Sequence, residues 1–425
     1  MRNKTILIVT YNWPPRNAIG TNRPYSWAKY WAENEQVAVK VITAKKYAFD
    51  GPLDYKLPAL KNVEVFEVPY IKVVRYLSFL MRYSWVRGLA KKIKKIVNKN
   101  KAEQIEVRNR WIEPALAMAK EIVKDVDFIV SSHGPSGCHI IAANLKKDNP
   151  EVIWVADYRD LWSQNHLLDY TEDQVERQRQ LEVSTVGVFA DHVTTVSRPL
   201  AEQLEALLRK PVSVITNGFD LLRSDIQDNI RRFFYQPVSK PVLIVYTGMI
   251  YPGYRDPIPL LEVISDMVED NIILTDDVRV IFYGEKNDAL KSIAGDKRFK
   301  KFVELKGHVS REVAYRAQSE ADILLLLESS SPGASGVLTG KLFEYMAAGR
   351  PVLSIGSSSQ SAICSVLQKT GCGICAHLDR DALKRIILEL VSGRRVPWFN
   401  PDVDAIMGYS RHSQAEKMFN IFNNP

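Results

Sequence analysis

The chain of 425 residues has only four cysteines, too few to predict a disulfide-stapled scaffold. It also lacks any uncharged apolar run as long as the roughly 18 residues that a membrane-spanning helix needs. Met1 leads almost directly into the short apolar run TILIVT and a polar loop, which does not match the core and cleavage site of a signal peptide. We therefore expect a soluble, cytoplasmic protein with a reduced interior.

Acidic residues are missing from one long stretch, and this makes the net charge uneven. The chain has 57 Lys and Arg against 49 Asp and Glu, for a formal charge of +8. The stretch 72–101 holds ten of the cations and no acid, and the rest of the chain carries 47 cations against 49 acids. The sequence is thus a near-neutral body with one basic segment.

Short Val/Ile-rich runs alternate with amphipathic stretches throughout the chain. Continuous apolar strands are typical of parallel sheets covered on both faces, and strand–helix alternation predicts doubly wound α/β folds. The alternation restarts after a polar piece, so two Rossmann-like domains facing a central cleft are expected. The predicted parts are a first domain (1–220), a linker (221–240), a second domain (241–400) and a C-terminal helix (401–425).

The loop after the first predicted strand reads YNWPPRNAIGTNRP. Gly20 allows close backbone approach, and the start of the next helix offers free N–H groups to an anion. The loop lacks the GxGxxG pattern, so no dinucleotide is inferred. An ordinary βα loop is the alternative interpretation.

A Gly/Ser-rich loop also precedes a helix in the second half, in SSSPGASGVLTGKLFEYMAAG. The amides of Thr339, Gly340 and Lys341 would lie in the first helical turn, where a phosphate binds. Glu344 follows one turn later and can accept two hydroxyl hydrogen bonds, as a ribose offers. The P-loop template fails, because Ser335 and Leu342 stand where it needs Gly and Ser or Thr. The alternative is a merely capped helix.

Charged residues follow a third apolar run, VIWVADYRDLW. Asp157, Arg159 and Asp160 stand at the end of this buried strand, where side chains of parallel sheets line sites. The preceding strand ends in SSHGPSG, around His133, which can supply a second polar wall. An Arg–Asp pair that only anchors the loop is the alternative.

The second domain's first loop, in YTGMIYPGYRD, brings Arg255 after two glycines. A guanidinium there can balance phosphate charge in bidentate fashion. A plain surface arginine is the alternative.

Other motifs predict no chemistry. Cys372 and Cys375 form a single C-x-x-C without a second pair, and the D-x-D at Asp125 and Asp127 precedes a strand, the wrong setting for a metal. The seven histidines are scattered, and no G-x-S-x-G elbow occurs. No metal and no cofactor are expected.

The basic segment mixes cations with bulky apolar and aromatic residues. This pattern fits an interfacial membrane helix, and each cation near an anionic surface contributes about 1 kcal/mol. RNA binding and a solvated helix face are the alternatives, but the bulky aliphatic residues favour lipid. The predicted membrane-contacting residues are Arg82, Trp85, Arg87, Lys91, Lys92, Lys94 and Lys95.

Taken in order, these segments resemble the family-4 glycosyltransferases of the GT-B fold. The resemblance rests on YNWPPRNAIGTNRP, WVADYRDLW, VTTVS, VITNGFD, YTGMIYPGYRDP, LKGHVSREVAYRAQSEADILLLL and, most specifically, TGKLFEYMAAGRPVLSIG, which together span nearly the whole chain. The resemblance implies a retaining, metal-independent transfer of a sugar from a nucleotide diphosphate to an acceptor. It also implies that the first domain (1–220) binds the acceptor and that the second domain (241–400) holds the nucleotide sugar. The C-terminal helix (401–425) is expected to return to the first domain.

The resemblance assigns roles to residues of the second domain. Glu344 matches the second acid of the family's E-x7-E, which holds the ribose, whereas the first acid is replaced by Gly336. Thr339, Gly340 and Lys341 fall where backbone amides meet the diphosphate. Arg255 falls near the phosphate-binding lysine, and the arginine that many members carry is Met249 here. His308 and Val309 fall where the backbone grips the base.

In the first domain, Gly20 matches the glycine loop that touches the donor phosphate. The family's T-x-H-D ends here as Asp157-Tyr-Arg159-Asp160, so Arg159 replaces the usual histidine. Asp160 or Asp157 is expected to take its place near the acceptor, and these three residues are the predicted catalytic set.

The sequence therefore predicts a hexosyltransferase-type enzyme that uses a nucleotide-sugar donor and a lipid-linked glycan acceptor for surface polysaccharide synthesis. It is expected to be cytoplasmic and peripheral on the inner membrane surface, with no nucleic-acid partner. A GT-B-fold nucleotide-sugar epimerase and a non-catalytic membrane-surface binding protein remain the alternatives.

Overall fold

The structure is a computed structural model that describes residues 4–47, 51–70, 108–165, 170–250, 255–285, 287–329, 335–356 and 361–423. The chain forms two compact units. The first comprises Met1–Thr216 with Arg411–Pro425, and the second comprises Asn217–Ser410.

The first unit is built on a seven-stranded, all-parallel sheet in the order β3-β2-β1-β4-β5-β6-β7. Strand order reverses direction between β1 and β4, which makes their carboxyl ends the topological switch point where open α/β sheets bind ligands. The strands are β1 (Lys4–Thr10), β2 (Val37–Ala44), β3 (Val63–Val68), β4 (Phe128–Ser132), β5 (Ile153–Tyr158), β6 (His192–Thr195) and β7 (Val212–Val214).

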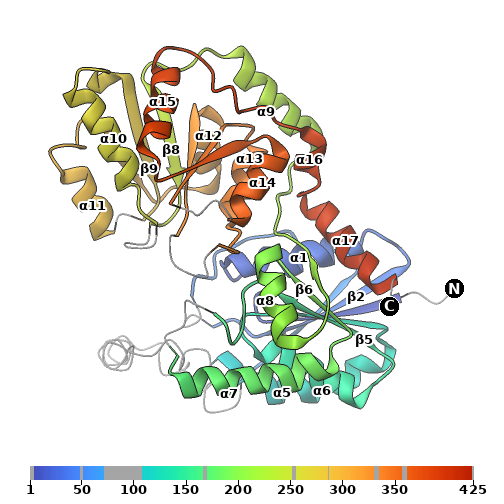
Figure 1. The fold of residues 1–425 in the computed structure, drawn as a ribbon. Helices are drawn as coiled ribbons and strands as arrows, with labels where there is room; N and C mark the ends of the chain where they lie inside the picture. The colour runs from blue at the N-terminus through green and yellow to red at the C-terminus, as the bar shows by residue number, and fades with distance from the viewer. Residues whose placement is uncertain are drawn as a thin grey trace, which may run out of the picture. The chain divides into compact units, whose positions relative to one another are not determined.

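Alternating strand residues supply the cores on the two faces of this sheet. Leu7 and Val9 of β1 belong to one core, whereas Ile6 and Ile8 belong to the other. Helices pack over both faces, as expected for a doubly wound fold (Figure 1). They are α1 (Ile19–Trp31), α5 (Ile112–Ile122), α6 (Gly137–Asp148), α7 (Glu172–Glu182), α8 (Arg198–Leu208) and α17 (Arg411–Asn423).

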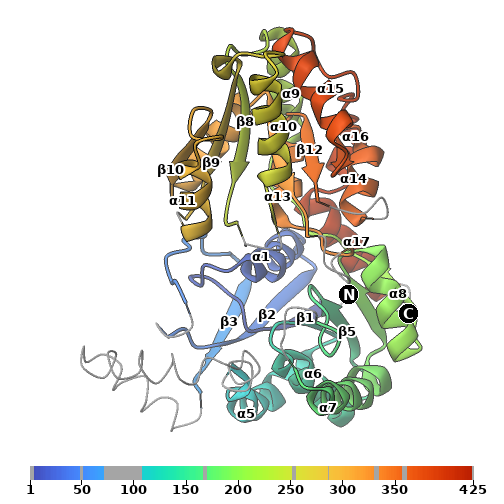
Figure 2. The same ribbon diagram turned by 60° about the vertical axis from the view of Figure 1, so that its left-hand side comes forward.

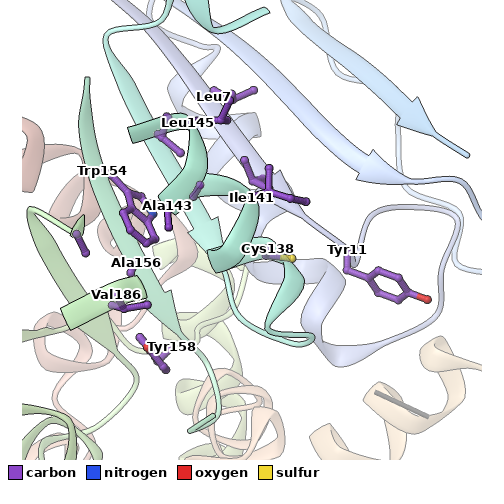
Figure 3. Packing of buried hydrophobic residues seen from close by; sticks show 14 of the residues in the cluster. Leu7, Tyr11, Cys138, Ile141, Ala143, Leu145, Trp154, Ala156, Tyr158 and Val186 are labelled. Carbon is purple, nitrogen blue, oxygen red and sulfur yellow. The ribbon is translucent and has the colours of Figure 1, made fainter. Parts of the chain in front are cut away.

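Bulky residues of β5 anchor the core on the α6 side of the sheet. Trp154, Ala156 and Tyr158 share one face of β5, and Ile141 of α6 belongs to the same buried cluster (Figure 3). All four are fully buried. Burial of a large apolar side chain stabilises the fold by roughly 1.5–3 kcal/mol. This core therefore holds β4 and β5 in place and fixes the position of their carboxyl ends.

The C-terminal helix α17 packs against α1 within the first unit. The indole N–H of Trp31 donates to the carbonyl oxygen of Ala415 at 2.9 Å, and its ring lies 5.7 Å from that of Phe422. Gln414 accepts the backbone N–H of Thr216 at 2.8 Å. The last helix therefore completes the face that α1 covers.

The second unit has a six-stranded parallel sheet in the order β10-β9-β8-β11-β12-β13, with its switch point between β8 and β11. Figure 2 labels β10, β9, β8 and β12 of this sheet. Its strands are β8 (Val242–Thr247), β9 (Val278–Tyr283), β10 (Val303–Gly307), β11 (Ile323–Leu327), β12 (Val352–Ile355) and β13 (Gly373–His377). Its helices are α9 (Arg223–Tyr235), α10 (Ile258–Glu269), α11 (Asp288–Gly295), α12 (Arg311–Glu320), α13 (Gly340–Ala347), α14 (Ala362–Thr370), α15 (Arg380–Val391) and α16 (Val403–Met407).

Two parallel-sheet α/β domains were predicted, and this fold class is confirmed. Two details differ from expectation. The segment 221–240, predicted as a linker, contains α9, whose Ile226 and Ile230 lie in a core of the second unit. The interior was predicted to be reduced, yet Cys364 and Cys375 form a disulfide. The β12–α14–β13 crossover brings these two residues together, which local sequence does not reveal.

Candidate active site

In the first unit, a cluster forms where β1, β4 and β5 end. Gly20 lies in the first turn of α1, and a Cβ added there would come within 2.1 Å of a guanidinium nitrogen of Arg159 and 2.8 Å of the Asn12 amide nitrogen. Asn12 also donates to the carbonyl oxygen of Gly134 at 3.0 Å. Glycine at position 20 is therefore needed so that Arg159 can lie against the start of α1.

Arg159 and Asp160 form an ion pair at this edge of the sheet. The guanidinium Nε donates to Oδ2 of Asp160 at 2.9 Å, and Nη2 contacts the same oxygen. The side chain of Arg159 is 22% exposed and that of Asp160 is 47% exposed. Because both are accessible, they can meet a substrate hydroxyl or phosphate.

Asp157 occupies a different environment, inside β5. Its carboxylate is fully buried and receives two bonds from Arg23, Nε to Oδ2 at 2.9 Å and Nη2 to Oδ1 at 2.6 Å. The hydroxyl groups of Ser132 and Thr194 donate to the same carboxylate. With four donors on two oxygens, Asp157 has its bonding capacity filled by neighbouring strands and α1.

His133 provides the second polar wall of this edge. It follows β4, and its ring stacks with those of Tyr158 and Trp162, at centroid distances of 5.6 Å and 6.1 Å. Burial is the main cause that lowers the pKa of His133 to about 4, so the ring is neutral at pH 7. Its Nδ1 has no hydrogen-bond partner among the described residues, which leaves a buried acceptor next to Arg159 and Asp160.

The loop that carries Arg159 and Asp160 is anchored to α7. The indole N–H of Trp162 donates to Gln178 at 2.6 Å, and the backbone N–H of Ser163 donates to the buried Glu182 at 3.0 Å. Burial raises the pKa of the Glu182 carboxyl group. A π-helix over Val183–Gly187 continues α7, and Glu182 is the residue just before it. These contacts fix the loop and its ion pair.

In the second unit, Lys341 is the central cation. Its Nζ donates to the hydroxyl oxygen of Tyr246 at 2.7 Å and lies 4.4 Å from the centre of the Tyr246 ring. A Cβ on Gly248, which has φ +123°, would come within 2.2 Å of the lysine side chain. Burial, followed by the charge of Arg255, lowers the pKa of Lys341 to about 7. The end of β8 is thus shaped around this ammonium group.

Lys341 also lies at the start of α13. Thr339 is the N-cap residue, but its side chain makes no capping hydrogen bond, and its buried hydroxyl oxygen has no partner among the described residues. The first amides of α13 thus lack the side-chain acceptor that usually caps a helix. An anion bound there would meet these amides and the Lys341 ammonium together.

Glu344 lies one turn further along α13. Its side chain is 43% exposed and forms an ion pair with Arg311 of α12, at 3.5 Å between nitrogen and oxygen. The carboxylate is therefore accessible, as a ribose-binding acid requires.

Residues 241–393 match the family model described as glycosyl transferases group 1. These residues are a glycosyl transferases group 1 domain. The match confirms the predicted enzyme class, a glycosyltransferase, for the unit that holds Lys341 and Glu344. A search of curated proteins finds no match.

Solved structures share the fold over nearly the full length. Anabaena HepE in complex with UDP-glucose is 12% identical, with 99% of this chain and 100% of that chain covered and a TM-score of 0.60. The lipopolysaccharide outer core galactosyltransferase WaaB, in its apo form, is 13% identical with the same coverage and a TM-score of 0.59. A UDP-forming α,α-trehalose-phosphate synthase from Burkholderia xenovorans is 9% identical, again with the same coverage, and has a TM-score of 0.64. At these identities the likeness shows the GT-B fold.

The other predicted donor-binding residues of the glycosyltransferase domain, Arg255, His308 and Val309, lie outside α13. Arg255 is close enough to Lys341 to lower its pKa. His308 is exposed and Val309 half-buried after β10. Gly307, with φ +79°, accepts the N–H of Gly284, and a Cβ on Gly284 would come within 2.2 Å of the Gly248 oxygen. The ends of β8, β9 and β10 therefore pack backbone to backbone beside the site.

Sequence reasoning missed several partners. Asn12, Arg23 and Arg311 lie within the quoted motifs and next to predicted site residues, but the sequence assigned no role to them. The predicted membrane residues Arg82, Trp85, Arg87, Lys91, Lys92, Lys94 and Lys95 lie outside the described residues. Among the residues that the structure does describe, no helix has the length and hydropathy needed to cross a bilayer.

Aspartates of the D-x-D motif at 125–127, and of a second D-x-D at 402–404, have structural partners. Asp127 accepts the backbone N–H of Thr5 at 2.8 Å. Asp402 caps α16 by accepting the N–H groups of Asp404 and Ala405. Both carboxylates therefore hold backbone in place.

Proposed function

We propose that this protein is a retaining, metal-independent glycosyltransferase of the family-4 type. It transfers a sugar from a nucleotide diphosphate to a lipid-linked acceptor at the cytoplasmic membrane face, in surface polysaccharide synthesis. The observation that carries the proposal is the ammonium group of Lys341, set at the uncapped start of α13 beside Arg255. Two cations and unpaired helix amides form a receptor for a pyrophosphate.

The chemistry follows from the charge that develops on the leaving group. As the bond between the anomeric carbon and the phosphate oxygen breaks, negative charge grows on the nucleoside diphosphate. Lys341, Arg255 and the amides of α13 stabilise that charge where it forms. The acceptor oxygen attacks from the same face, and its proton passes to the departing phosphate oxygen. This route retains the anomeric configuration and needs no strong protein base.

The roles of the first-unit residues follow from their exposure. Asp160 is the accessible carboxylate, so it orients the acceptor hydroxyl. Arg159 holds Asp160 in place and presents the exposed part of its guanidinium group to the acceptor. Neutral His133 offers Nδ1 as a further acceptor. Asp157 positions β5 through Arg23. In the second unit, Glu344 accepts the ribose hydroxyls, Arg311 orients it, and the backbone at His308 and Val309 contacts the base.

A donor screen tests this function directly. UDP-glucose is the first candidate, because Anabaena HepE holds it. Thermal stabilisation identifies the donor, and NMR of the glycoside formed on a lipid-diphosphate glycan acceptor gives its anomeric configuration. An inverted product would contradict the retaining mechanism. Turnover of the free nucleotide sugar without acceptor would favour an epimerase. If the wild-type protein bound no nucleotide at all, a non-catalytic protein would be favoured.

Arg255→Ala should weaken the binding of a nucleoside diphosphate far more than that of the nucleoside. A hydrogen bond to a charged group is worth about 1.5–3 kcal/mol, so a roughly 10–100-fold loss is expected for the diphosphate. Titration calorimetry with UDP and uridine measures both. Arg298→Ala is the control, because Arg298 pairs with Asp296 on the exposed surface. Equal losses for the two ligands would refute the phosphate role.

The membrane part of the proposal rests on the sequence of the basic segment. Replacing Lys91, Lys92, Lys94 and Lys95 by glutamine should release the protein from anionic vesicles, because each cation contributes about 1 kcal/mol. Sedimentation with phosphatidylglycerol vesicles measures partitioning. The matched control replaces four exposed lysines of the second unit, Lys291, Lys297, Lys306 and Lys369. Unchanged partitioning of the first variant would reject the lipid interpretation.

A further inference from the structure

Two cysteines and a buried carboxylate meet in the second unit. Cys364 lies in the first turn of α14, Cys375 lies in β13, and Glu328 directly follows β11. One ligand atom of each lies within 4.8 Å of the others. No step of sugar transfer uses these residues.

The topology explains how this cluster arises. Ser354 of β12 and Cys375 of β13 are partners in the parallel register. The Ser354 hydroxyl donates to Oε1 of Glu328, and the sulfur of Cys375 lies 4.0 Å from the same oxygen. Helix α14 is the crossover between β12 and β13, and its first turn places Cys364 over Cys375, to which it is bonded as a disulfide.

In the reduced form of this cluster, a thiolate would repel the nearby carboxylate, and a bound cation would neutralise this repulsion. Glu328 is 9% exposed, so its charge is poorly hydrated. Reduction of the disulfide by a dithiol adds two electrons and two protons and yields two thiols beside this carboxylate. Ionising either thiol would then bring like charges together at a half-buried site. A divalent cation removes that repulsion by binding all three groups.

We propose that the reduced chain binds Zn²⁺ through the thiolates of Cys364 and Cys375 and the carboxylate of Glu328. Two sulfurs and one oxygen form a donor set that favours Zn²⁺ over Mg²⁺ or Ca²⁺. Binding displaces the two thiol protons to solvent, and water fills the fourth position. Ser354 orients the Glu328 carboxylate. The disulfide and the zinc complex are alternative ways to tie β13 to α14.

The other two cysteines provide an internal control. Cys138 and Cys372 are fully buried, and burial raises the pKa of each thiol to about 12. Cys372 stands only three residues from Cys375 in the C-x-x-C motif, but its sulfur contacts the carbonyl oxygen of Thr370. Cys375 is therefore paired with Cys364, whereas the C-x-x-C motif would pair it with Cys372.

The test measures metal binding, so it does not depend on sugar transfer. The full-length protein is reduced with dithiothreitol, freed of reductant under argon, and titrated with Zn²⁺ or Co²⁺. We expect one zinc per chain by elemental analysis and thiolate-to-cobalt charge-transfer absorption. The oxidised protein should bind neither metal. A disulfide that resists reduction, or a reduced chain that binds no metal, would overturn the proposal.

Substitutions identify the ligands. Cys364→Ser and Cys375→Ser should abolish the charge-transfer band, and Glu328→Gln should weaken zinc binding by at least the roughly 10–100-fold that loss of an outer-shell partner costs. Cys372→Ala is the matched control and should bind zinc as the wild type does. Far-UV circular dichroism checks that each variant is folded. Full binding by Glu328→Gln, or loss in Cys372→Ala alone, would show that the ligands are other residues.

Discussion

Lys341→Met is expected to stabilise the protein and, at the same time, to remove most of its donor binding. Burial lowers the pKa of this ammonium from its ordinary value of about 10.5 to about 7, so the folded chain disfavours the charge that function needs. Each unit of pKa corresponds to about 1.36 kcal/mol. After subtraction of the lost hydrogen bond and ring contact with Tyr246, the free energy of unfolding of the variant is expected to be roughly 1–3 kcal/mol higher than that of the wild type.

The pH dependence of this gain has a definite sign. Between pH 7 and about 10.5 the unfolded lysine is protonated while the folded lysine is not, so wild-type stability rises with pH in this window. The advantage of Lys341→Met should therefore be largest at or below pH 7 and shrink toward pH 10. Urea denaturation at several pH values measures it. Lys291→Met, at an exposed lysine paired with Asp288, should show no such trend.

Donor binding should favour the charged form of Lys341. A pyrophosphate beside Lys341 raises its pKa, so binding at pH 8 takes up close to one proton, because only about a tenth of the free protein is charged there. Calorimetry with UDP in buffers of different ionisation enthalpy measures this uptake, which Lys341→Met should abolish. Transfer should slow by about 10²–10³-fold, as when an oxyanion donor is lost. Unchanged UDP affinity in the variant would refute the role of Lys341.

The sequence predicted most strands because their signal is local. Short runs rich in Val and Ile predict strands over Val37–Ala44, Val63–Val68, Phe128–Ser132 and Gly373–His377, and the structure has strands with these same bounds. The runs need not be wholly apolar, since Glu64 and Glu67 interrupt Val63–Val68. The sequence also favours one α-helix over 173–190, but the structure changes to a π-helix at Val183. Its local sequence is helical throughout, and the π-helix follows Glu182, which is buried through tertiary contacts that helical periodicity does not encode.

The candidate site was predicted in part, for the same reason. Gly20 and the start of α13 are visible as a glycine or cap pattern next to a helix. What fills the space beside Gly20 is Arg159, from a segment over 130 residues away, and only the fold reveals this approach. The C-x-x-C motif likewise directed attention to Cys372, whereas the partner of Cys375 is Cys364, in the preceding helix.

Asp157 and Asp160 illustrate this limit most sharply, because both follow the same apolar run. Their difference depends on Arg23, which is remote in sequence and pairs with Asp157 inside the sheet. A buried ion pair between distant residues leaves no local pattern. The sequence alone therefore does not distinguish the two aspartates, whereas the structure does, and experiments can test the difference.

Asp157→Ala is expected to destabilise the protein by about 3–5 kcal/mol, because it leaves the Arg23 guanidinium buried without its counter-ion. The hydroxyl groups of Ser132 and Thr194 would lose their acceptor as well. Asp160→Ala removes a carboxylate that is 47% exposed and pairs with Arg159 near the surface. The free energy of unfolding of this variant should therefore change by less than about 1 kcal/mol, while transfer activity falls. Urea denaturation and initial rates separate the two effects.

The double variant Arg23→Met with Asp157→Leu provides the decisive control. Replacing both partners of a buried ion pair by apolar residues of similar size is often neutral or stabilising, so much of the stability lost in Asp157→Ala should return. If activity returns with stability, Asp157 acts only by positioning β5 and α1, and Asp160 is the carboxylate that meets the acceptor. An Asp157→Ala protein as stable as the wild type but inactive would instead place Asp157 at the acceptor itself.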